Sequence, residues 1–174
     1  MKTKRICIVG AESTGKTTLA IDLAKHYQTA WVPEYGRTYT EGRIYTAKES
    51  WESAEFTHIA KMQNAFEDAL EKVANKILIC DTDALATGIW HEKYLGFESE
   101  EVKKLSKAQT FDLYIVTDPL TPFEQDEIRV GEDSREWMHK RFIEELEKIG
   151  KNYMIVKGSK EARIRQATEQ IDIL

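Results

Sequence analysis

Residues 10–17 read GAESTGKT and match the phosphate-binding pattern GxxxxGK[ST]. The apolar run ICIV precedes this stretch at positions 6–9, and a helix-forming run, TLAIDLAKHY, follows it at 18–27. In this pattern the glycines let the backbone curl so that successive N–H groups point at a phosphate, next to the N-terminus of the following helix. A chance match is the alternative, but a random chain of this length carries the pattern on the order of once in a hundred times. The stretch therefore predicts a nucleotide-binding loop between a strand and a helix.

The rest of the chain alternates short apolar runs with longer amphipathic segments. This alternation is typical of an α/β fold in which helices cover a parallel sheet, here of five strands in three layers within one domain, residues 1–174. The expected strands are 5–9, 29–32, 76–80, 113–117 and 153–156. The expected helices are 17–27, 53–75, 84–94, the segments that Ser99 and Ser134 cap, and 160 to the C-terminus. In the long helix 53–75, the expected buried stripe is Phe56, Ile59, Met62, Phe66, Ala69, Leu70 and Val73.

The overall composition excludes several classes of protein. The formal net charge is −5, whereas a general nucleic-acid binder normally has a basic excess. No apolar run approaches the ~20 residues of a membrane span. Cys7 and Cys80 lie in apolar runs, which favours buried thiols in a reducing compartment. We therefore expect a cytoplasmic protein with a small-molecule substrate, no nucleic-acid partner and no membrane partner.

The phosphate loop carries its own chemistry. Lys16 is expected to bridge the β- and γ-phosphates of ATP, and the Thr17 hydroxyl to ligate Mg²⁺. The predicted nucleotide-binding residues are Gly10, Ala11, Glu12, Ser13, Thr14, Gly15, Lys16, Thr17 and Thr18.

A second acidic motif follows the apolar run at 77–80, where the sequence continues as Asp81-Thr82-Asp83. A carboxylate at the end of such a strand can hold Mg²⁺, directly or through water. We assign Asp81 to the metal, and Asp83 to both the substrate and the cap of the helix that follows. The alternative is that both aspartates are purely structural, with Asp83 as an N-cap.

The segment PEYGR at 33–37 follows the second expected strand, at the sheet edge where open α/β folds bind ligands. Glu34 is placed to accept the proton of an attacking hydroxyl, and Arg37 to pair with a phosphate or carboxylate. An ordinary surface ion pair between these two residues is the alternative. Phe56 and Phe66 offer flat rings that could stack on a base, although aromatic residues on a helical stripe usually belong to the core.

Residues 119–133, PLTPFEQDEIRVGED, form the least regular part of the chain, and a loop of that length is usually functional. Arg129 and Arg135 lie six positions apart at its end. Because phosphoryl transfer develops charge on the γ-phosphate oxygens, an arginine that closes over the nucleotide would stabilise the reaction. Arg141, inside a regular helix, is better explained as part of a charged helix face.

The order of GAESTGKTTLA, TAWVPEYGRTY, CDTDALAT and FDLYIVTDPLTPF, followed by arginines six positions apart, resembles the NadR-like P-loop kinases. The likeness covers nearly the whole chain, and the pair EYGR and DTD is its specific part. It implies a P-loop NTPase fold of the nucleoside/nucleotide kinase type, with a lid around 119–141. The implied reaction moves the γ-phosphate of MgATP to the 5′-hydroxyl of nicotinamide riboside and gives nicotinamide mononucleotide.

The resemblance also implies individual roles. Glu34, Tyr35 and Arg37 would line the riboside pocket, Asp83 would serve the sugar, and Arg129 and Arg135 match the lid. With the two aromatic rings added, the predicted substrate-binding residues are Glu34, Tyr35, Arg37, Phe56, Phe66 and Asp83, and the predicted catalytic residues are Lys16, Glu34, Asp83, Arg129 and Arg135.

The sequence departs from the family in the lid, where Phe123 and residues 125–127 stand in place of Trp and Asp-Asp-Gly. It also lacks the HxGH motif of the family's adenylyltransferase domain, so we expect a free-standing kinase. Two alternatives remain: a kinase for another nucleoside or a nucleoside monophosphate, and an ATP-binding regulatory switch without an acceptor substrate.

Overall fold

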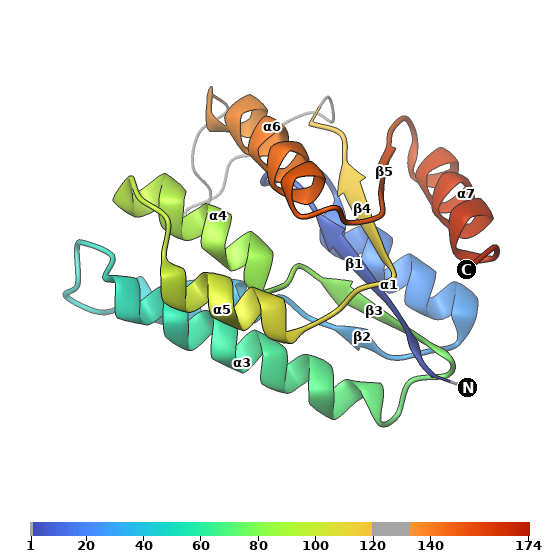
Figure 1. Cartoon of the computed structure of the whole chain (residues 1–174), viewed down its shortest axis with the longest axis horizontal. Helices are drawn as coiled ribbons and strands as arrows, with labels where there is room; N and C mark the ends of the chain where they lie inside the picture. Colours follow the sequence, from blue (N-terminus) through green and yellow to red (C-terminus); the bar gives the residue numbers. More distant parts are fainter. Residues whose placement is uncertain (1, 120–132) are drawn as a thin grey trace.

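A five-stranded parallel sheet forms the centre of the protein in the computed structural model, which describes residues 2–119 and 133–174 (Figure 1). The strand order is β2-β3-β1-β4-β5. The strands are β1 Lys4–Val9, β2 Trp31–Val32, β3 Ile77–Asp81, β4 Leu113–Thr117 and β5 Tyr153–Val156. The helices are α1 Lys16–Tyr27, α2 Tyr35–Arg43, α3 Ser53–Glu71, α4 Ala84–Leu95, α5 Glu100–Ala108, α6 Asp133–Lys148 and α7 Lys160–Ile171. The predicted α/β class with a five-stranded parallel sheet is confirmed.

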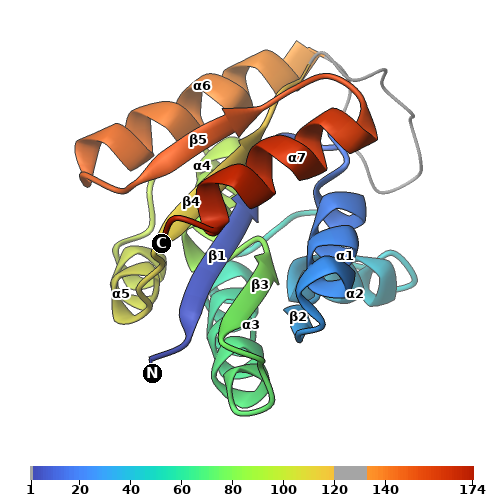
Figure 2. The same cartoon turned by 90° about the vertical axis from the view of Figure 1, so that its right-hand side faces the viewer.

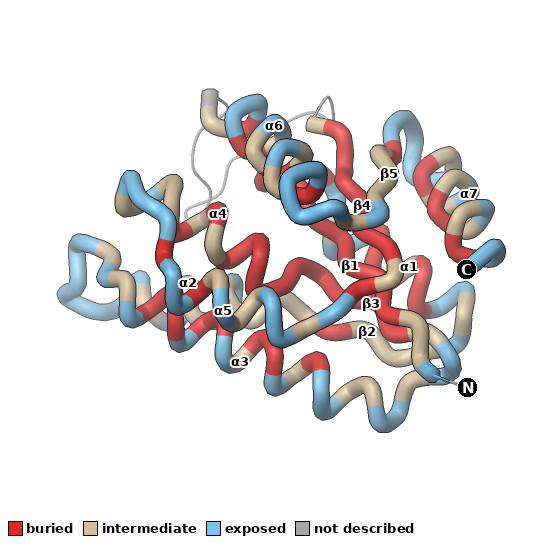
Figure 3. The backbone as a smooth tube through the Cα atoms, in the orientation of Figure 1, coloured by how far each residue is buried: buried red, intermediate tan, exposed pale blue. Residues whose placement is uncertain are grey.

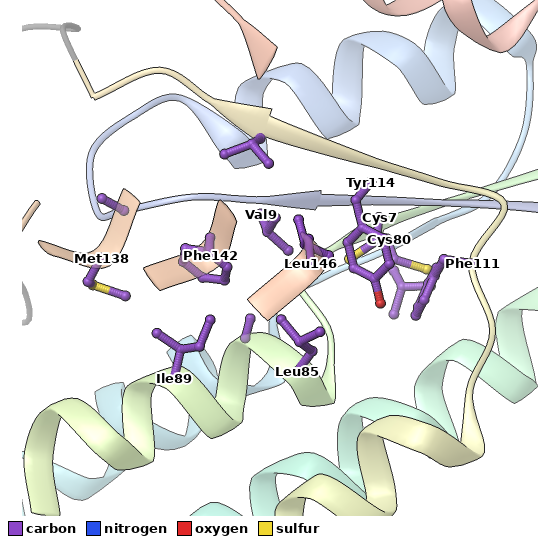
Figure 4. Close-up of a cluster of buried hydrophobic side chains, with 14 of the residues drawn as sticks. Cys7, Val9, Cys80, Leu85, Ile89, Phe111, Tyr114, Met138, Phe142 and Leu146 are labelled. Carbon is purple, nitrogen blue, oxygen red and sulfur yellow. The ribbon is translucent and has the colours of Figure 1, made fainter. Parts of the chain in front are cut away.

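Helices cover both faces of this sheet, which is why its strands are continuous apolar runs (Figure 3). Successive side chains of a strand point to opposite faces. Cys7 and Val9 of β1 therefore face α4 and α6, and pack with Leu85, Ile89, Phe142 and Leu146 (Figure 4). Ile6 and Ile8 face the neighbouring helices α1 and α7 (Figure 2). Both cysteines are buried, as expected.

Several predicted elements differ in detail. The strand expected at 29–32 is reduced to Trp31–Val32, and α6 begins at Asp133, so that Ser134 lies inside the helix. Helix α3 ends at Glu71 rather than at residue 75, and Val73 is 71% exposed. Of the expected stripe, Phe56 and Ile59 are buried and Phe66 and Leu70 pack against the core, but Ala69 and Val73 are exposed. The buried face of the helix also carries polar side chains: Glu55, Gln63, Asn64 and Glu67.

The sequence reading missed α2 altogether, because none of its nine residues is buried and no apolar periodicity marks it. Its N-terminus follows β2 at the carboxyl edge of the sheet, where the loops that follow β1 and β3 also lie. These three loops and the first turns of α1 and α2 contain the predicted site residues of positions 10–18, 34–37 and 81–83, whereas Phe56 and Phe66 lie on α3. Within the described residues, no helix is both long and apolar enough to cross a membrane.

Candidate active site

The phosphate loop joins β1 to α1. Gly10 has a φ of 148°, and a Cβ there would lie 2.3 Å from Thr117 Oγ1 of β4, so only glycine fits. Gly15, with a φ of 83°, is the N-cap of α1 and provides no capping side chain. The first N–H groups of α1 and the positive end of its dipole therefore face the loop, as an anion requires. Lys16 Nζ donates to the carbonyl oxygen of Ala11 at 2.7 Å.

Two supports of this loop were not predicted. Thr117 of β4 shares a hydrogen bond of 2.6 Å between hydroxyl oxygens with Thr14. Arg163 of α7, which is 8% exposed, donates from Nη1 to the carbonyl oxygen of Thr14 at 2.6 Å. No local pattern could identify them, because they lie more than 100 positions from the loop in sequence.

Thr17 and Asp81 meet as the metal prediction requires. The Thr17 hydroxyl donates to Asp81 Oδ2 at 2.5 Å. The other oxygen, Asp81 Oδ1, is buried and has no hydrogen-bond partner among the described residues. Burial raises the pKa of Asp81, while the nearby Lys16 ammonium acts in the opposite direction. A hydroxyl next to a carboxylate oxygen with unused acceptor capacity is a donor set that suits Mg²⁺.

A cavity of about 280 Å³ extends from the phosphate loop toward α2, α3 and α4. Residues 12–18 of the loop line one end of it, whereas Gly10 and Ala11 lie outside the lining. Three predicted substrate residues line the remainder: Glu34, Arg37 and Phe56. Gln63 and Thr82 also contribute to the wall.

Glu34 occupies the N-cap position of α2 and lines the cavity. Burial raises the pKa of this carboxyl to about 7, and the Asp81 carboxylate adds to the shift. Lys16 and Arg37 oppose it. A carboxyl with a pKa near neutrality suits a general base. Arg37 Nε donates to Glu41 Oε1 at 2.9 Å, an ion pair within α2.

The other three predicted substrate residues do not line this cavity. The Tyr35 ring packs against Phe66, with ring centroids 5.5 Å apart, and its hydroxyl lies 3.1 Å from His58 Nε2. Phe66 contributes to the core under the sheet. Both oxygens of Asp83 are engaged: Oδ1 accepts from the Ala86 N–H at 2.9 Å. Oδ2 accepts from the hydroxyl of Tyr114 at 2.8 Å.

Aromatic residues also line the cavity, and the predicted site did not include three of them: Trp51, Trp90 and Tyr94. The rings of Trp51 and Tyr94 lie 5.5 Å apart, and Trp90 stacks on Tyr94 at 5.9 Å. The guanidinium of Arg43 lies 4.2 Å from the Trp51 ring. The available signal for Trp90 and Tyr94 was their i, i+4 spacing just after the DTD motif.

The predicted lid arginines have different outcomes. Arg129 lies outside the described residues, as do Phe123 and residues 125–127. Arg135 is in the first turn of α6 and is 3% exposed. Arg141 joins α6 to α4 and to the loop after it, through ion pairs at 2.7–3.0 Å with Glu92, Glu98 and Glu145. Its role in the described structure is therefore that of a helix-to-helix support.

Comparison with known proteins places the fold and the phosphate loop in a family. A family model described as AAA domain matches residues 5–163. The chain belongs to this family. This chain is also 32% identical over 126 residues to the trifunctional NAD biosynthesis/regulator protein NadR of Salmonella typhimurium (strain LT2) and of Escherichia coli (strain K12). The match covers 72% of this chain and 31% of each relative, so the aligned region is under a third of the length of these proteins.

Solved structures extend the likeness to nearly the whole chain. A crystal structure of NadR in complex with NR is 25% identical with a TM-score of 0.79, and covers 99% of this chain and 51% of that one. The thymidylate kinase of Ehrlichia chaffeensis is 13% identical with a TM-score of 0.66, and the match covers 99% of this chain and 98% of the kinase. The AAA domain is thus homologous to NadR and has the fold of the P-loop nucleoside and nucleotide kinases.

Proposed function

We propose that this protein transfers the γ-phosphate of ATP to the 5′-hydroxyl of nicotinamide riboside and so produces nicotinamide mononucleotide. One observation carries the proposal. One cavity is lined by the phosphate loop, by the aromatic residues Trp51, Trp90 and Tyr94, and by Glu34. Homology to NadR, and the binding of NR by one NadR structure of the same fold, support this choice of acceptor.

The nucleotide end of the site uses the N-terminus of α1 and Lys16 to hold the phosphates. Thr17 and Asp81 would hold Mg²⁺, which neutralises charge on the phosphate oxygens when it is bound. The lysine leaves its contact with the carbonyl oxygen of Ala11 to reach the β- and γ-phosphates. These residues thus orient the γ-phosphate toward the acceptor.

The acceptor hydroxyl reacts next to Glu34. The 5′-oxygen of the riboside forms a bond to the γ-phosphorus while the bond from that phosphorus to the β,γ-bridging oxygen breaks. The hydroxyl proton passes to the carboxylate of Glu34, and ADP leaves. Because the pKa of Glu34 is about 7, part of the population is ionised at neutral pH and can accept that proton.

The aromatic wall suits the base of the riboside. Nicotinamide riboside carries a positively charged pyridinium ring, which the faces of Trp51, Trp90 and Tyr94 can bind by stacking and by cation–π attraction. A nucleoside monophosphate would need a cation for its phosphate. Among the described residues that line the cavity, the cations are Lys16, which the ATP phosphates use, and Arg37, which pairs with Glu41. This distribution of charge favours an acceptor without a phosphate.

The test measures ADP release by the purified protein with MgATP and a panel of acceptors: nicotinamide riboside, nicotinic acid riboside, the common nucleosides and their monophosphates. Lys16→Ala provides the blank, and we expect turnover with the pyridine ribosides to depend on Lys16. Preferential turnover of another nucleoside would refute nicotinamide riboside as the acceptor but would still support kinase activity. Binding of ATP without turnover of any acceptor would favour a regulatory switch.

A further inference from the structure

The N-terminus of α2 is capped by a residue from another helix. Glu34 is the N-cap and has an extended backbone, but its side chain makes no capping hydrogen bond. An N-cap side chain normally accepts a hydrogen bond from the N–H of the second or third helical residue, here Gly36 or Arg37. The N–H of the first helical residue, Tyr35, donates to Oε1 of Gln63 in α3 at 2.9 Å. The first turn of α2 is thus tied to α3, and the carboxyl group of Glu34 lines the cavity without making a capping bond.

The same side chain also contacts the loop that follows β3. Gln63 Nε2 donates to the carbonyl oxygen of Thr82 at 3.5 Å. Thr82 separates Asp81 from Asp83 and has a φ of 66°, a left-handed conformation that is rare and strained for a β-branched residue. Its N–H donates to the carbonyl oxygen of Ile8 at 2.9 Å. The strained peptide is thus held from the sheet on one side and from α3 on the other.

The two backbone partners determine how the amide of Gln63 is oriented, and Glu67 of the same helix is a further hydrogen-bond partner. A backbone N–H can only donate and a carbonyl oxygen can only accept, so Oε1 must face Tyr35 and Nε2 must face Thr82. Gln63 is 1% exposed, so water does not readily replace either partner. One buried amide therefore connects the turn that contains Glu34 to the turn that contains Asp81.

We propose that Gln63 is a positioning residue that keeps the carboxylate of Glu34 free of the α2 cap and holds it in register with the Asp81 loop. The proposal rests on the proposed function, in which Glu34 accepts the hydroxyl proton. When Gln63 is lost, the first turn of α2 is released from α3, and the carboxylate of Glu34 can turn to the N–H groups of Gly36 and Arg37, the usual donors to an N-cap side chain. Capping by Glu34 then withdraws this carboxylate from the acceptor hydroxyl, while the N–H of Tyr35 stays without an acceptor.

The kinetic test compares Gln63→Leu with Asn64→Leu. Asn64 is the next residue of α3 and is 8% exposed, and its Nδ2 donates to the carbonyl oxygen of Leu105 at 2.9 Å, away from the cavity. Both variants replace a buried amide of the same helix by leucine, so Asn64→Leu controls for the general effect of removing such a group. We expect Gln63→Leu to lower kcat for the riboside by about 10- to 100-fold with little change in the KM for ATP. Asn64→Leu should keep kcat within about twofold.

A second measurement does not depend on activity. Hydrogen exchange of the Tyr35 amide should become faster in Gln63→Leu, because its acceptor is lost, and stay slow in Gln63→Glu, which keeps an acceptor oxygen. Faster exchange in Gln63→Leu with kcat retained would overturn the positioning role. An equal loss of kcat in Asn64→Leu would also overturn it. If the unmodified protein phosphorylates no riboside, the proposed function fails, whereas unchanged exchange in Gln63→Leu would refute the capping contact itself.

Discussion

Tyr114→Phe measures how much the fold depends on the hydrogen bond between Tyr114 and Asp83. The tyrosine is 2% exposed, the aspartate is 1% exposed, and the hydroxyl donates to Asp83 Oδ2 at 2.8 Å. Phenylalanine leaves a buried carboxylate oxygen without its donor, which costs about 1.5–3 kcal/mol for a hydrogen bond to a charged group. At about 2–4 °C per kcal/mol for a chain of this size, the melting temperature should fall by about 3–12 °C.

Asp83→Asn tests whether Asp83 is structural or catalytic. The variant removes the charge but keeps an oxygen that can accept from the Ala86 N–H. If Asp83 is structural, kcat should stay within about threefold, whereas loss of a catalytic base costs about 10²- to 10⁴-fold. Urea denaturation at pH 7 gives the stabilities, and ADP release well below the melting temperature gives kcat. A loss under about 0.5 kcal/mol in Tyr114→Phe would refute the energetic argument. A hundredfold loss of kcat in folded Asp83→Asn would refute the structural role.

Three further predictions concern the cavity and the loop. Because the pKa of Glu34 is raised to about 7 and the base must be ionised, kcat/KM should rise with pH through about 7. Glu34→Gln should lower kcat by about 10²- to 10⁴-fold and abolish this rise. A pH-independent rate in the unmodified protein would exclude Glu34 as the base. Gly10→Ala places a Cβ 2.3 Å from Thr117 Oγ1 and should cost about 1–3 kcal/mol of stability in a urea titration, so a variant as stable as the parent would contradict the packing. Trp51→Ala should weaken riboside binding by about 1–3 kcal/mol in calorimetry and leave ATP binding unchanged, whereas equal losses for both ligands would point to a general collapse of the site.

Helix α3 illustrates where periodicity misleads. Its start at Ser53 and the burial of Phe56 and Ile59 agree with the prediction. Further along, the buried positions hold Gln63 and Glu67, because these polar groups find partners in other elements. Glu67 pairs with Arg5 of β1 at 2.6 Å, a contact that no local pattern reveals. A hydrophobicity scale assigns such polar residues to the surface, so the buried face expected from the apolar residues is displaced around the helix axis from the observed one.

Local chemistry accounts for the parts of the site that were predicted. The phosphate loop is a local sequence motif: its glycines, its lysine and the helix N-terminus all lie within residues 10–18. It can therefore be recognised without the rest of the chain. The pairing of Thr17 with Asp81 also follows, because parallel strands bring their carboxyl ends to one edge.

Tertiary packing decided the rest. It formed α2, which buries no residue of its own and whose first N–H is capped by Gln63 of α3. It also brought Trp51, Trp90 and Tyr94 into one wall and engaged both oxygens of Asp83 away from that cavity. These features depend on contacts between residues far apart in sequence. The amino-acid order therefore predicts which groups bind phosphate, and the folded chain determines which other groups face them.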